Sequence, residues 1–101
     1  MEYINLTFND FDLDPKILES LKEMKYLEPS EIQAKAIPEV LKKHDVVALA
    51  QTGSGKTAAC AIPICHMVDT SIDAIQALVI VPTRELALQY ATETQKIGKK
   101  R

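Results

Sequence analysis

The sequence lacks the features that would indicate a membrane, secreted or metal-binding protein. No apolar run approaches the roughly 20 residues that a membrane span needs, and the acidic first residues do not show the basic-then-apolar order of a signal peptide. Cys60 and Cys65 are so spaced that on a helix they project from separate faces, so a disulfide between them is not expected. Neither His44 nor His66 has a second ligand at metal-binding spacing. These absences favour a cytoplasmic protein with two buried thiols.

An excess of basic charge is also lacking, since the 101 residues carry a net charge of −2, which argues against a nucleic-acid binder. The charge is unevenly distributed: residues 1–45 hold six basic and ten acidic side chains, whereas residues 84–101 hold five basic and two acidic ones. An anionic partner would therefore meet the C-terminal end. A solvated helix face and a frayed tail explain the same charges. We favour that interpretation for the last four of them, Lys96, Lys99, Lys100 and Arg101.

The pattern of apolar residues predicts a single α/β domain. Asp14-Pro15 is typical of a helix start, and Ser30 can cap the next helix. Two short runs, 45–50 and 77–82, are apolar on both faces, as buried parallel strands are. The expected elements are a helix at about 15–25, a helix from about 30 to 41, a strand at 45–50, a helix from 55, a strand at 77–82 and a helix from 83 to about 98. A helix between two strands makes them parallel, so the expected order is helix-helix-strand-helix-strand-helix with parallel strands.

The stretch AQTGSGKT, Ala50 to Thr57, carries the clearest chemical signal. It fits the phosphate-binding loop between a strand and a helix, except that Ala50 replaces the first glycine of the strict form. Gly53 and Gly55 allow backbone conformations in which successive N–H groups converge on a phosphate at the positive end of a helix. In such loops the lysine, here Lys56, reaches the β- and γ-phosphates, and the following hydroxyl ligates Mg²⁺. A turn that merely joins a strand to a helix is the simpler alternative, but the placement favours binding of a nucleoside triphosphate.

Three segments together resemble one family. AQTGSGKT is similar to motif I of the DEAD-box RNA helicases. YLEPSEIQ, Tyr26 to Gln33, resembles their Q motif, which reads adenine, and PTREL, Pro82 to Leu86, resembles their motif Ia, which lies on the RNA-binding face of the first RecA-like domain. Phe8 stands where the family has an upstream aromatic residue that stacks near the base. One departure is Lys25, at a position where the family usually has glycine.

The resemblance implies a partial RecA-like P-loop fold in an ATP-dependent RNA helicase, with ATP, Mg²⁺ and RNA as its ligands. It implies a catalytic role for Lys56 and Thr57, with Thr57 as the metal ligand. The residues that it implies in nucleotide binding are Phe8, Tyr26, Gln33, Gln51, Thr52, Gly53, Ser54, Gly55, Lys56 and Thr57, and those in RNA binding are Pro82, Thr83 and Arg84. The carboxamide of Gln33 offers a donor and an acceptor side by side, which complements N6 and N7 of adenine and favours ATP over GTP.

Several of these residues also have purely structural explanations. Ser30 and Gln33 form a capping-box pattern, so Gln33 can cap a helix instead of contacting a base. Thr83 is a natural N-cap at the start of a helix, and Arg84 can simply be exposed. Phe8 can be a packing anchor for the N-terminal arm. The residues alone leave these alternatives open, and for Gln33, Thr83 and Arg84 the resemblance favours the contacts with ligands.

Some parts that the family's ATPase needs do not occur in these 101 residues. There is no Asp-Glu-Ala-Asp tetrapeptide and no Ser-Ala-Thr motif, and two strands are fewer than the usual sheet of about 4–6. We therefore interpret residues 1–101 as the N-terminal portion of a RecA-like ATP-binding domain, with residues 1–14 as an N-terminal arm and the remainder of the helicase core missing. The alternatives are a non-catalytic P-loop nucleotide-binding fragment that completes a partner and, with less support, a small P-loop kinase. On its own the chain is expected to be marginally folded, to bind ATP poorly, to hydrolyse none and to bind RNA weakly.

Overall fold

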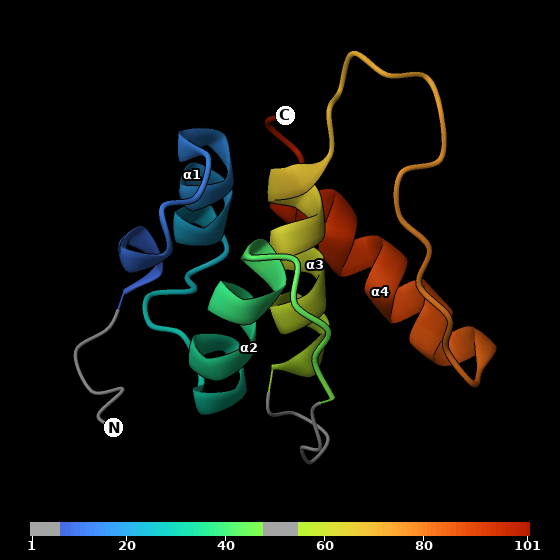
Figure 1. Ribbon diagram of the computed structural model, residues 1–101, viewed down its shortest axis with the longest axis horizontal. Helices are drawn as coiled ribbons and strands as arrows, with labels where there is room; N and C mark the ends of the chain where they lie inside the picture. Colours follow the sequence, from blue (N-terminus) through green and yellow to red (C-terminus); the bar gives the residue numbers. More distant parts are fainter. Residues whose placement is uncertain (1–6, 48–54) are drawn as a thin grey trace.

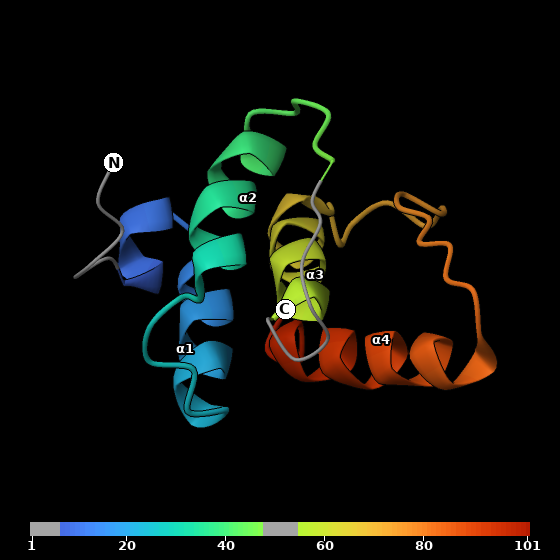
Figure 2. The same ribbon diagram turned by 90° about the horizontal axis from the view of Figure 1, so that it is seen from below.

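The computed structural model describes residues 7–47 and 55–101, and within them every regular element is a helix. In chain order these are the 3₁₀ helix η1 Phe8–Phe11 and the α-helices α1 Pro15–Glu23, α2 Glu31–Leu41, α3 Lys56–Met67 and α4 Arg84–Ile97. α3 lies at the centre, with α2 packed on one side of it and α4 on another (Figure 1). Figure 2 shows that α4 runs crosswise to α1 and α2. None of the described helices is both long and apolar enough to cross a membrane.

The core receives fully buried side chains from every α-helix. These are Ile17 and Leu21 of α1, Ile37 of α2, Ile62 of α3 and Ile97 of α4. The arm adds Phe8 and Phe11, whose rings meet edge to face with their centroids 6.0 Å apart. Burying one such side chain stabilises a fold by about 1.5–3 kcal/mol. One shared core therefore holds the arm and the four helices together.

Capping residues fix where the helices begin, as the sequence predicts. α1 begins after Asp14 and α4 after Thr83, and each of these side chains accepts a hydrogen bond from a backbone N–H of the first turn. At α2 the capping box is formed, because Ser30 Oγ accepts from the Gln33 N–H at 3.4 Å and Gln33 Oε1 accepts from the Ser30 N–H at 2.9 Å. The predicted helix starts are thus confirmed for α1, α2 and α4.

α1 and α2 end in the same way, with a lysine in the left-handed region. Lys25 has a φ of 64° and Lys43 a φ of 65°. After α1, the N–H of Tyr26 donates to the carbonyl of Leu21 and the N–H of Lys25 donates to that of Lys22, which is the Schellman arrangement. Glycine is favoured here because it has no Cβ to clash in this conformation. The turn therefore forms at Lys25 in spite of the departure from glycine, but under backbone strain.

Replacing Lys25 or Lys43 by glycine is expected to raise the free energy of unfolding by about 1 kcal/mol, because each change relieves the left-handed strain. Lys42 is the matched control, since its φ of −82° carries no such strain. Lys42→Gly removes the same side chain and is expected to lower stability through the added backbone entropy. Urea denaturation followed by the helical circular dichroism signal measures all three variants. An equal gain for Lys42→Gly would show that the loss of positive charge, and not the backbone, is responsible.

The predicted parallel strands are not confirmed. Residues 45–47 and 77–82 have no regular secondary structure, and residues 48–50 lie outside the described part of the chain. A strand exists only through hydrogen bonds to a neighbouring strand, and neither segment has such a neighbour among residues 7–47 and 55–101. Val47 is 93% exposed and Ile80 is 85% exposed. Both segments thus have the apolar composition of buried strands without the sheet that this composition predicted.

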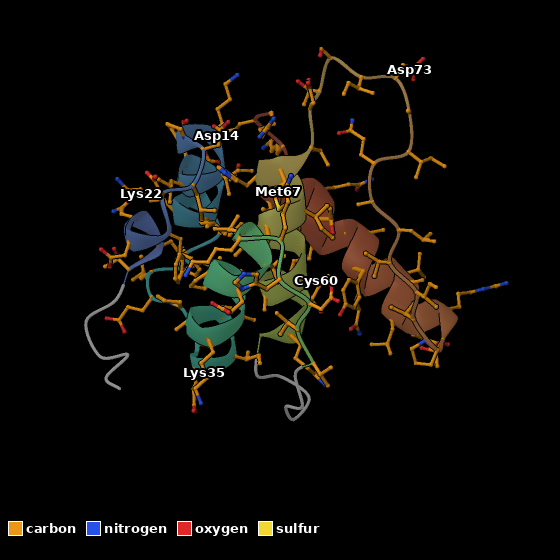
Figure 3. All side chains as sticks on the ribbon, viewed as in Figure 1. Asp14, Lys22, Lys35, Cys60, Met67 and Asp73 are labelled. Atoms are coloured by element: carbon orange, nitrogen blue, oxygen red, sulfur yellow. The ribbon has the colours of Figure 1, made fainter. Side chains whose placement is uncertain are left out.

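The connection between α3 and α4 is a long loop that stands away from the helices. Figure 3 shows its side chains, Asp73 among them, spreading outward. The side chain of Gln76 joins the two ends of its first part. Gln76 Oε1 accepts from the Asp69 N–H at 2.8 Å, and Gln76 Nε2 donates to the Asp69 carbonyl at 2.8 Å. The loop therefore has local order of its own, although its apolar side chains are exposed.

The C-terminal residues are docked on the helices, so the interpretation of the tail as frayed is wrong for Lys100 and Arg101. The Arg101 guanidinium donates to the His66 carbonyl at 2.8 Å and lies 3.4 Å from the Asp14 carboxylate. Lys100 Nζ lies 2.7 Å from a carboxylate oxygen of Glu23. These two basic groups pair with the acidic N-terminal part of the chain, and are not a free patch for an anionic partner.

Both cysteines are free thiols, as the sequence predicts. Cys65 is buried and its Sγ donates to the carbonyl of Thr94 at 3.6 Å, where α3 and α4 approach each other. Cys60 is only half-buried. Burial raises the pKa of both thiols, so both are protonated and unreactive near neutral pH.

Candidate functional site

The start of α3 is the described part of the phosphate loop. Gly55 precedes the helix and has a φ of 91°, which is a conformation that favours glycine. No side chain of the described residues caps this helix start. Its first backbone N–H groups can therefore donate hydrogen bonds to a bound anion. Lys56 is exposed and Thr57 half-buried in the first turn. Gln51, Thr52, Gly53 and Ser54 lie outside the described residues, and their roles stay predictions.

Gln33 joins α2 to this helix start. Its side chain is 6% exposed, and its Nε2 donates to the Gly55 carbonyl at 3.2 Å while its Oε1 accepts from the Ser30 N–H at 2.9 Å. The structural explanation of Gln33 as a capping residue is therefore correct. A carboxamide can make four hydrogen bonds, so these two leave one donor and one acceptor. Contact of that remaining pair with adenine stays a prediction.

The two aromatic residues implied in nucleotide binding lie in different surroundings. Phe8 is 4% exposed and packs in the core against Phe11, as expected of a packing anchor. Tyr26 is half-buried, and its hydroxyl donates to the carboxylate of Glu93 on α4. Burial, together with this carboxylate, raises the pKa of Tyr26 to about 12. A place for either ring beside the base stays a prediction.

The segment implied in RNA binding lies at the start of α4. Pro82, Thr83 and Arg84 are all exposed. Thr83 Oγ1 accepts from the Leu86 N–H at 3.2 Å, so the alternative role of Thr83 as an N-cap is correct. In Figure 1 the start of α3 lies at the bottom of the molecule and the start of α4 at its right-hand end. RNA contact by the start of α4 stays a prediction.

Lys56 also borders an apolar cavity of about 430 Å³. Side chains of α2 and α3 form most of its wall, with Val46 and Tyr90 beside them. Residues 7–47 and 55–101 contain no group of three or more histidine, cysteine or acidic side chains that could hold a metal ion. Ligation of Mg²⁺ by the Thr57 hydroxyl stays a prediction.

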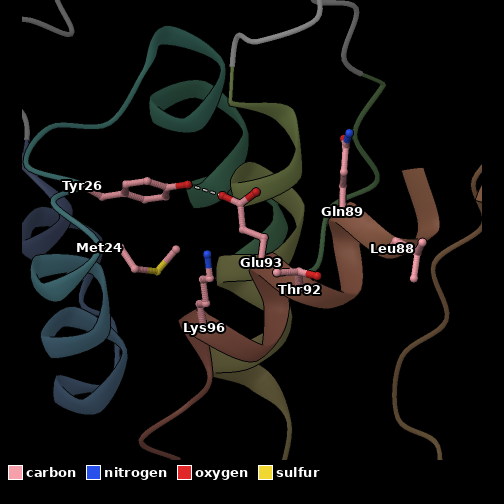
Figure 4. Close-up of a pocket in the computed structure, with 7 residues that line it drawn as sticks. All are labelled: Met24, Tyr26, Leu88, Gln89, Thr92, Glu93 and Lys96. Atoms are coloured by element: carbon pink, nitrogen blue, oxygen red, sulfur yellow. Dashed lines mark hydrogen bonds between the residues drawn. The ribbon is translucent and has the colours of Figure 1, made fainter. Parts of the chain in front are cut away.

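Glu93 is the hydrogen-bond partner of Tyr26 (Figure 4), and the sequence did not reveal this role. It lies 67 residues from Tyr26 in the chain, and nothing in the local pattern of α4 distinguishes it from an exposed helical glutamate. The bond between Gln33 and Gly55 was equally invisible, since the two residues are 22 apart. Only the packing of α2, α3 and α4 brings these partners together.

Comparison with known proteins gives consistent results. A family model described as DEAD/DEAH box helicase matches residues 30–101. The ATP-dependent RNA helicase DeaD of Buchnera aphidicola is 50% identical over 91 residues, which are 90% of this chain and 15% of that relative. The DEAD-box ATP-dependent RNA helicase RhpA of Helicobacter pylori is 50% identical over 97 residues, which are 96% of this chain and 20% of that relative. This chain thus spans a fifth or less of the length of these relatives.

Solved structures agree with the sequence comparison. A DEAD box protein from Methanococcus jannaschii matches with a TM-score of 0.87 and 40% identity over 91% of this chain and 25% of that chain. Dbp5 of S. cerevisiae bound to RNA and ADP BeF3 matches with a TM-score of 0.86 and 34% identity over 94% of this chain and 25% of that chain. On these matches, the chain belongs to the DEAD/DEAH box helicase family.

Proposed function

We propose that the chain is the ATP-binding portion of an ATP-dependent RNA helicase, which couples ATP binding and hydrolysis to the unwinding or remodelling of RNA duplexes. Residues 1–101 form the N-terminal portion of its RecA-like domain, with residues 1–14 as an arm. The observation that carries the proposal is the hydrogen bond from Gln33 to Gly55, because it joins the segment resembling the Q motif to the helix that follows the phosphate loop. The names of the relatives and the nucleotide and RNA in the Dbp5 structure support it.

The start of α3 fits the triphosphate of ATP. Gly55 carries no Cβ, and any added there would meet Gln33 Nε2 at 2.5 Å, so only glycine lets the Gln33 carboxamide lie this close to the start of α3. The first amides of α3 would hold a phosphate, Lys56 would neutralise the β- and γ-phosphates, and the hydroxyl of Thr57 would ligate Mg²⁺. Bound Mg²⁺–ATP supplies the phosphoanhydride bond whose hydrolysis drives the helicase.

The start of α4 is proposed to contact the RNA backbone. Thr83 and Arg84 are exposed there, and helix starts commonly offer backbone N–H groups to phosphates in addition to the one that Thr83 caps. Because few phosphate contacts are available, this binding is weak and falls as salt rises. The remaining helicase core would supply the other contacts.

A second candidate function is a non-catalytic nucleotide-binding module that completes a partner. The apolar cavity beside Lys56 and the exposed side chains of Val47, Leu78 and Ile80 favour it, since they leave apolar surface open to a neighbour.

We propose that residues 45–50 and 77–82 become parallel strands when further strands lie beside them. The free thiols fit a reducing compartment, and the cytoplasm is the proposed location.

Base choice tests the proposed function. Replacing Gln33 by alanine is expected to weaken ATP binding roughly 10–100-fold more than GTP binding, because the carboxamide pairs with N6 and N7 of adenine but not with guanine. Isothermal titration of the chain with both nucleotides in the presence of Mg²⁺ measures the two affinities. Ser30→Ala is the matched control, since it removes the cap acceptor of α2 and keeps the carboxamide. Equal losses of ATP and GTP affinity in Gln33→Ala would instead show that Gln33 acts only through the fold.

A further inference from the structure

The imidazole of His66 holds the last residue of the N-terminal arm on α3. His66 lies in the last turn of α3, and its Nδ1 accepts a hydrogen bond of 2.9 Å from the backbone N–H of Asp14, 52 residues earlier in the chain. Both residues are half-buried. Asp14 is also the N-cap of α1, since its carboxylate accepts from the Lys16 N–H at 2.8 Å. The bond to His66 therefore fixes the point where the arm passes into α1.

This bond specifies the protonation state of the His66 ring. A backbone N–H can only donate, so the ring nitrogen that it meets must offer a lone pair. Nδ1 is therefore without a proton, and the single proton of the neutral ring lies on Nε2. A second proton would enter at Nδ1 and turn this acceptor into a donor. The part-buried N–H of Asp14 would then have lost its acceptor, which costs more than an ordinary hydrogen bond contributes.

Arg101 braces the same junction without using the imidazole. Its guanidinium donates to the carbonyl of His66 at 2.8 Å and to that of Val68 at 2.7 Å, and it lies 3.4 Å from the carboxylate of Asp14. In Figure 1 the C-terminus accordingly lies beside the upper end of α3. Arginine and aspartate side chains ordinarily keep their charges between about pH 5 and 8, whereas histidine side chains change theirs there. The imidazole is thus the part of this junction that changes its state near neutral pH.

Charged groups of both signs surround His66. They are Asp10, Asp12 and Asp14 of the arm, Lys42 and Lys43 after α2, and Arg101 after α4. On α1, Glu19 and Glu23 pair with Lys100 instead. The three acidic and three basic groups affect how readily the ring takes up a proton. The effect of that proton on the bond to Asp14 does not depend on them, because it follows from the loss of the lone pair.

The arm is a part of the fold in which one hydrogen bond has a large influence. Phe8, Phe11 and Leu13 anchor it in the core. Ordering a segment costs conformational entropy at every residue, so a short segment with few anchors is held by a small net free energy. Chain ends accordingly open locally at a fraction of the free energy of global unfolding. Loss of the bond to His66 can therefore shift the arm between a docked and an undocked state while the helices stay folded.

We propose that His66 is a positioning residue that docks the N-terminal arm on α3 in its neutral form with the proton on Nε2, and that protonation of its ring undocks the arm. This inference goes beyond the proposed function and involves no nucleotide. The docked state holds one proton fewer than the undocked state, so docking strengthens as the pH rises and weakens as it falls. Undocking also exposes Phe8 and Phe11, which the docked arm buries.

Hydrogen exchange followed by NMR on residues 1–101 tests the proposal. The amide of Asp14 reports the docked arm, and the amide of Leu21 inside α1 reports the fold as a whole. The protection of each amide is measured relative to an unstructured peptide at the same pH. Between about pH 8 and pH 5 the protection of Asp14 is expected to fall roughly tenfold or more, while Leu21 keeps its protection. The ¹⁵N signals of the His66 ring are expected to show an unprotonated Nδ1 at the higher pH.

Variants at His66 separate the hydrogen bond from the charge. His66→Asn places an amide oxygen close to the position of Nδ1 and cannot titrate, so Asp14 is expected to stay protected at both pH values. His66→Gln carries its carboxamide one carbon further out, so the protection of Asp14 is expected to be low at both. His44→Asn is the matched control, because His44 is exposed and pairs with Glu39. This control should keep the pH response of the unchanged chain.

Three results would overturn the proposal. They are an Asp14 amide that stays protected at the lower pH in the unchanged chain, a neutral His66 ring with its proton on Nδ1, and a pH response that survives in His66→Asn. An equal loss of protection at Asp14 and Leu21 on acidification would also overturn it, because the whole fold and not the arm would then depend on pH.

Discussion

Replacing Gly55 by alanine is expected to lower the free energy of unfolding of the chain by about 3 kcal/mol and to abolish ATP binding. Gly55 has a φ of 91°, which an alanine adopts only under strain. The added Cβ would also lie 2.5 Å from Gln33 Nε2 and 2.9 Å from Ser30 Oγ. Gln33 is buried and bonded at both ends of its carboxamide, so it cannot move aside without loss of the capping box of α2.

Gly98→Ala is the matched control for this substitution. Gly98 has a φ of −89°, and a Cβ there would meet Cys65 Sγ at 3.2 Å. A loss well under that of Gly55→Ala is expected, because the backbone is unstrained and one contact must give by only a few tenths of an ångström. Urea denaturation gives both stabilities, and titration with ATP gives the affinities. The double variant Gly55→Ala/Gln33→Ala should recover the steric part of the loss and leave the backbone part. Equal losses for the two single variants would contradict the close approach of Gln33 to Gly55.

The helix starts could be predicted from the sequence because their signals are local. Asp14 followed by proline, Ser30 followed by Gln33, and Thr83 at the start of α4 each act within one turn of the helix. A capping side chain and its backbone partner are two or three residues apart, so the pattern of letters contains the whole interaction. The same holds for the end of α4 at Gly98.

The predicted strands depended on partners that no local pattern contains. Residues 77–82 have the branched apolar side chains of a buried strand, yet a strand forms only beside another one. Composition thus indicated the kind of surroundings these residues suit, and the described chain does not provide them. The frayed tail failed for a similar reason, since the acidic partners of Lys100 and Arg101 lie in α1 and just before it, far away in the sequence.

The chemistry expected at the candidate site stays a prediction from the sequence, whereas the contacts between its segments could not be predicted from the sequence at all. The types of side chain at Gly55, Lys56 and Gln33 indicated a triphosphate and a purine before any fold was known. The bonds from Gln33 to Gly55 and from Tyr26 to Glu93 depend on how α2, α3 and α4 pack, which the sequence pattern does not specify. Such contacts join the segments to one another, and only the structure reveals them.

Replacing Lys56 by alanine is expected to weaken ATP binding roughly 10–100-fold while leaving the fold as stable as before or slightly more stable. Lys56 is the first residue of α3 and is exposed. A positive charge is unfavourable at the positive end of a helix, so the charge of Lys56 lowers the stability of the fold. A triphosphate reverses that balance, because its charge meets both the side chain and the helix start. Function and stability should therefore change in opposite directions in this variant.

Lys16→Ala is the matched control, since Lys16 is also an exposed lysine in the first turn of a helix, α1. Its removal should change stability in the same direction as that of Lys56 and leave ATP binding intact. Titration with ATP and Mg²⁺ gives the affinities of the unchanged chain and of both variants, and urea denaturation gives their stabilities. If Lys56→Ala bound ATP as the unchanged chain does, the phosphates would not be held at the start of α3. If it lost ATP binding only together with its fold, Lys56 would be a structural residue and the charge argument would be wrong.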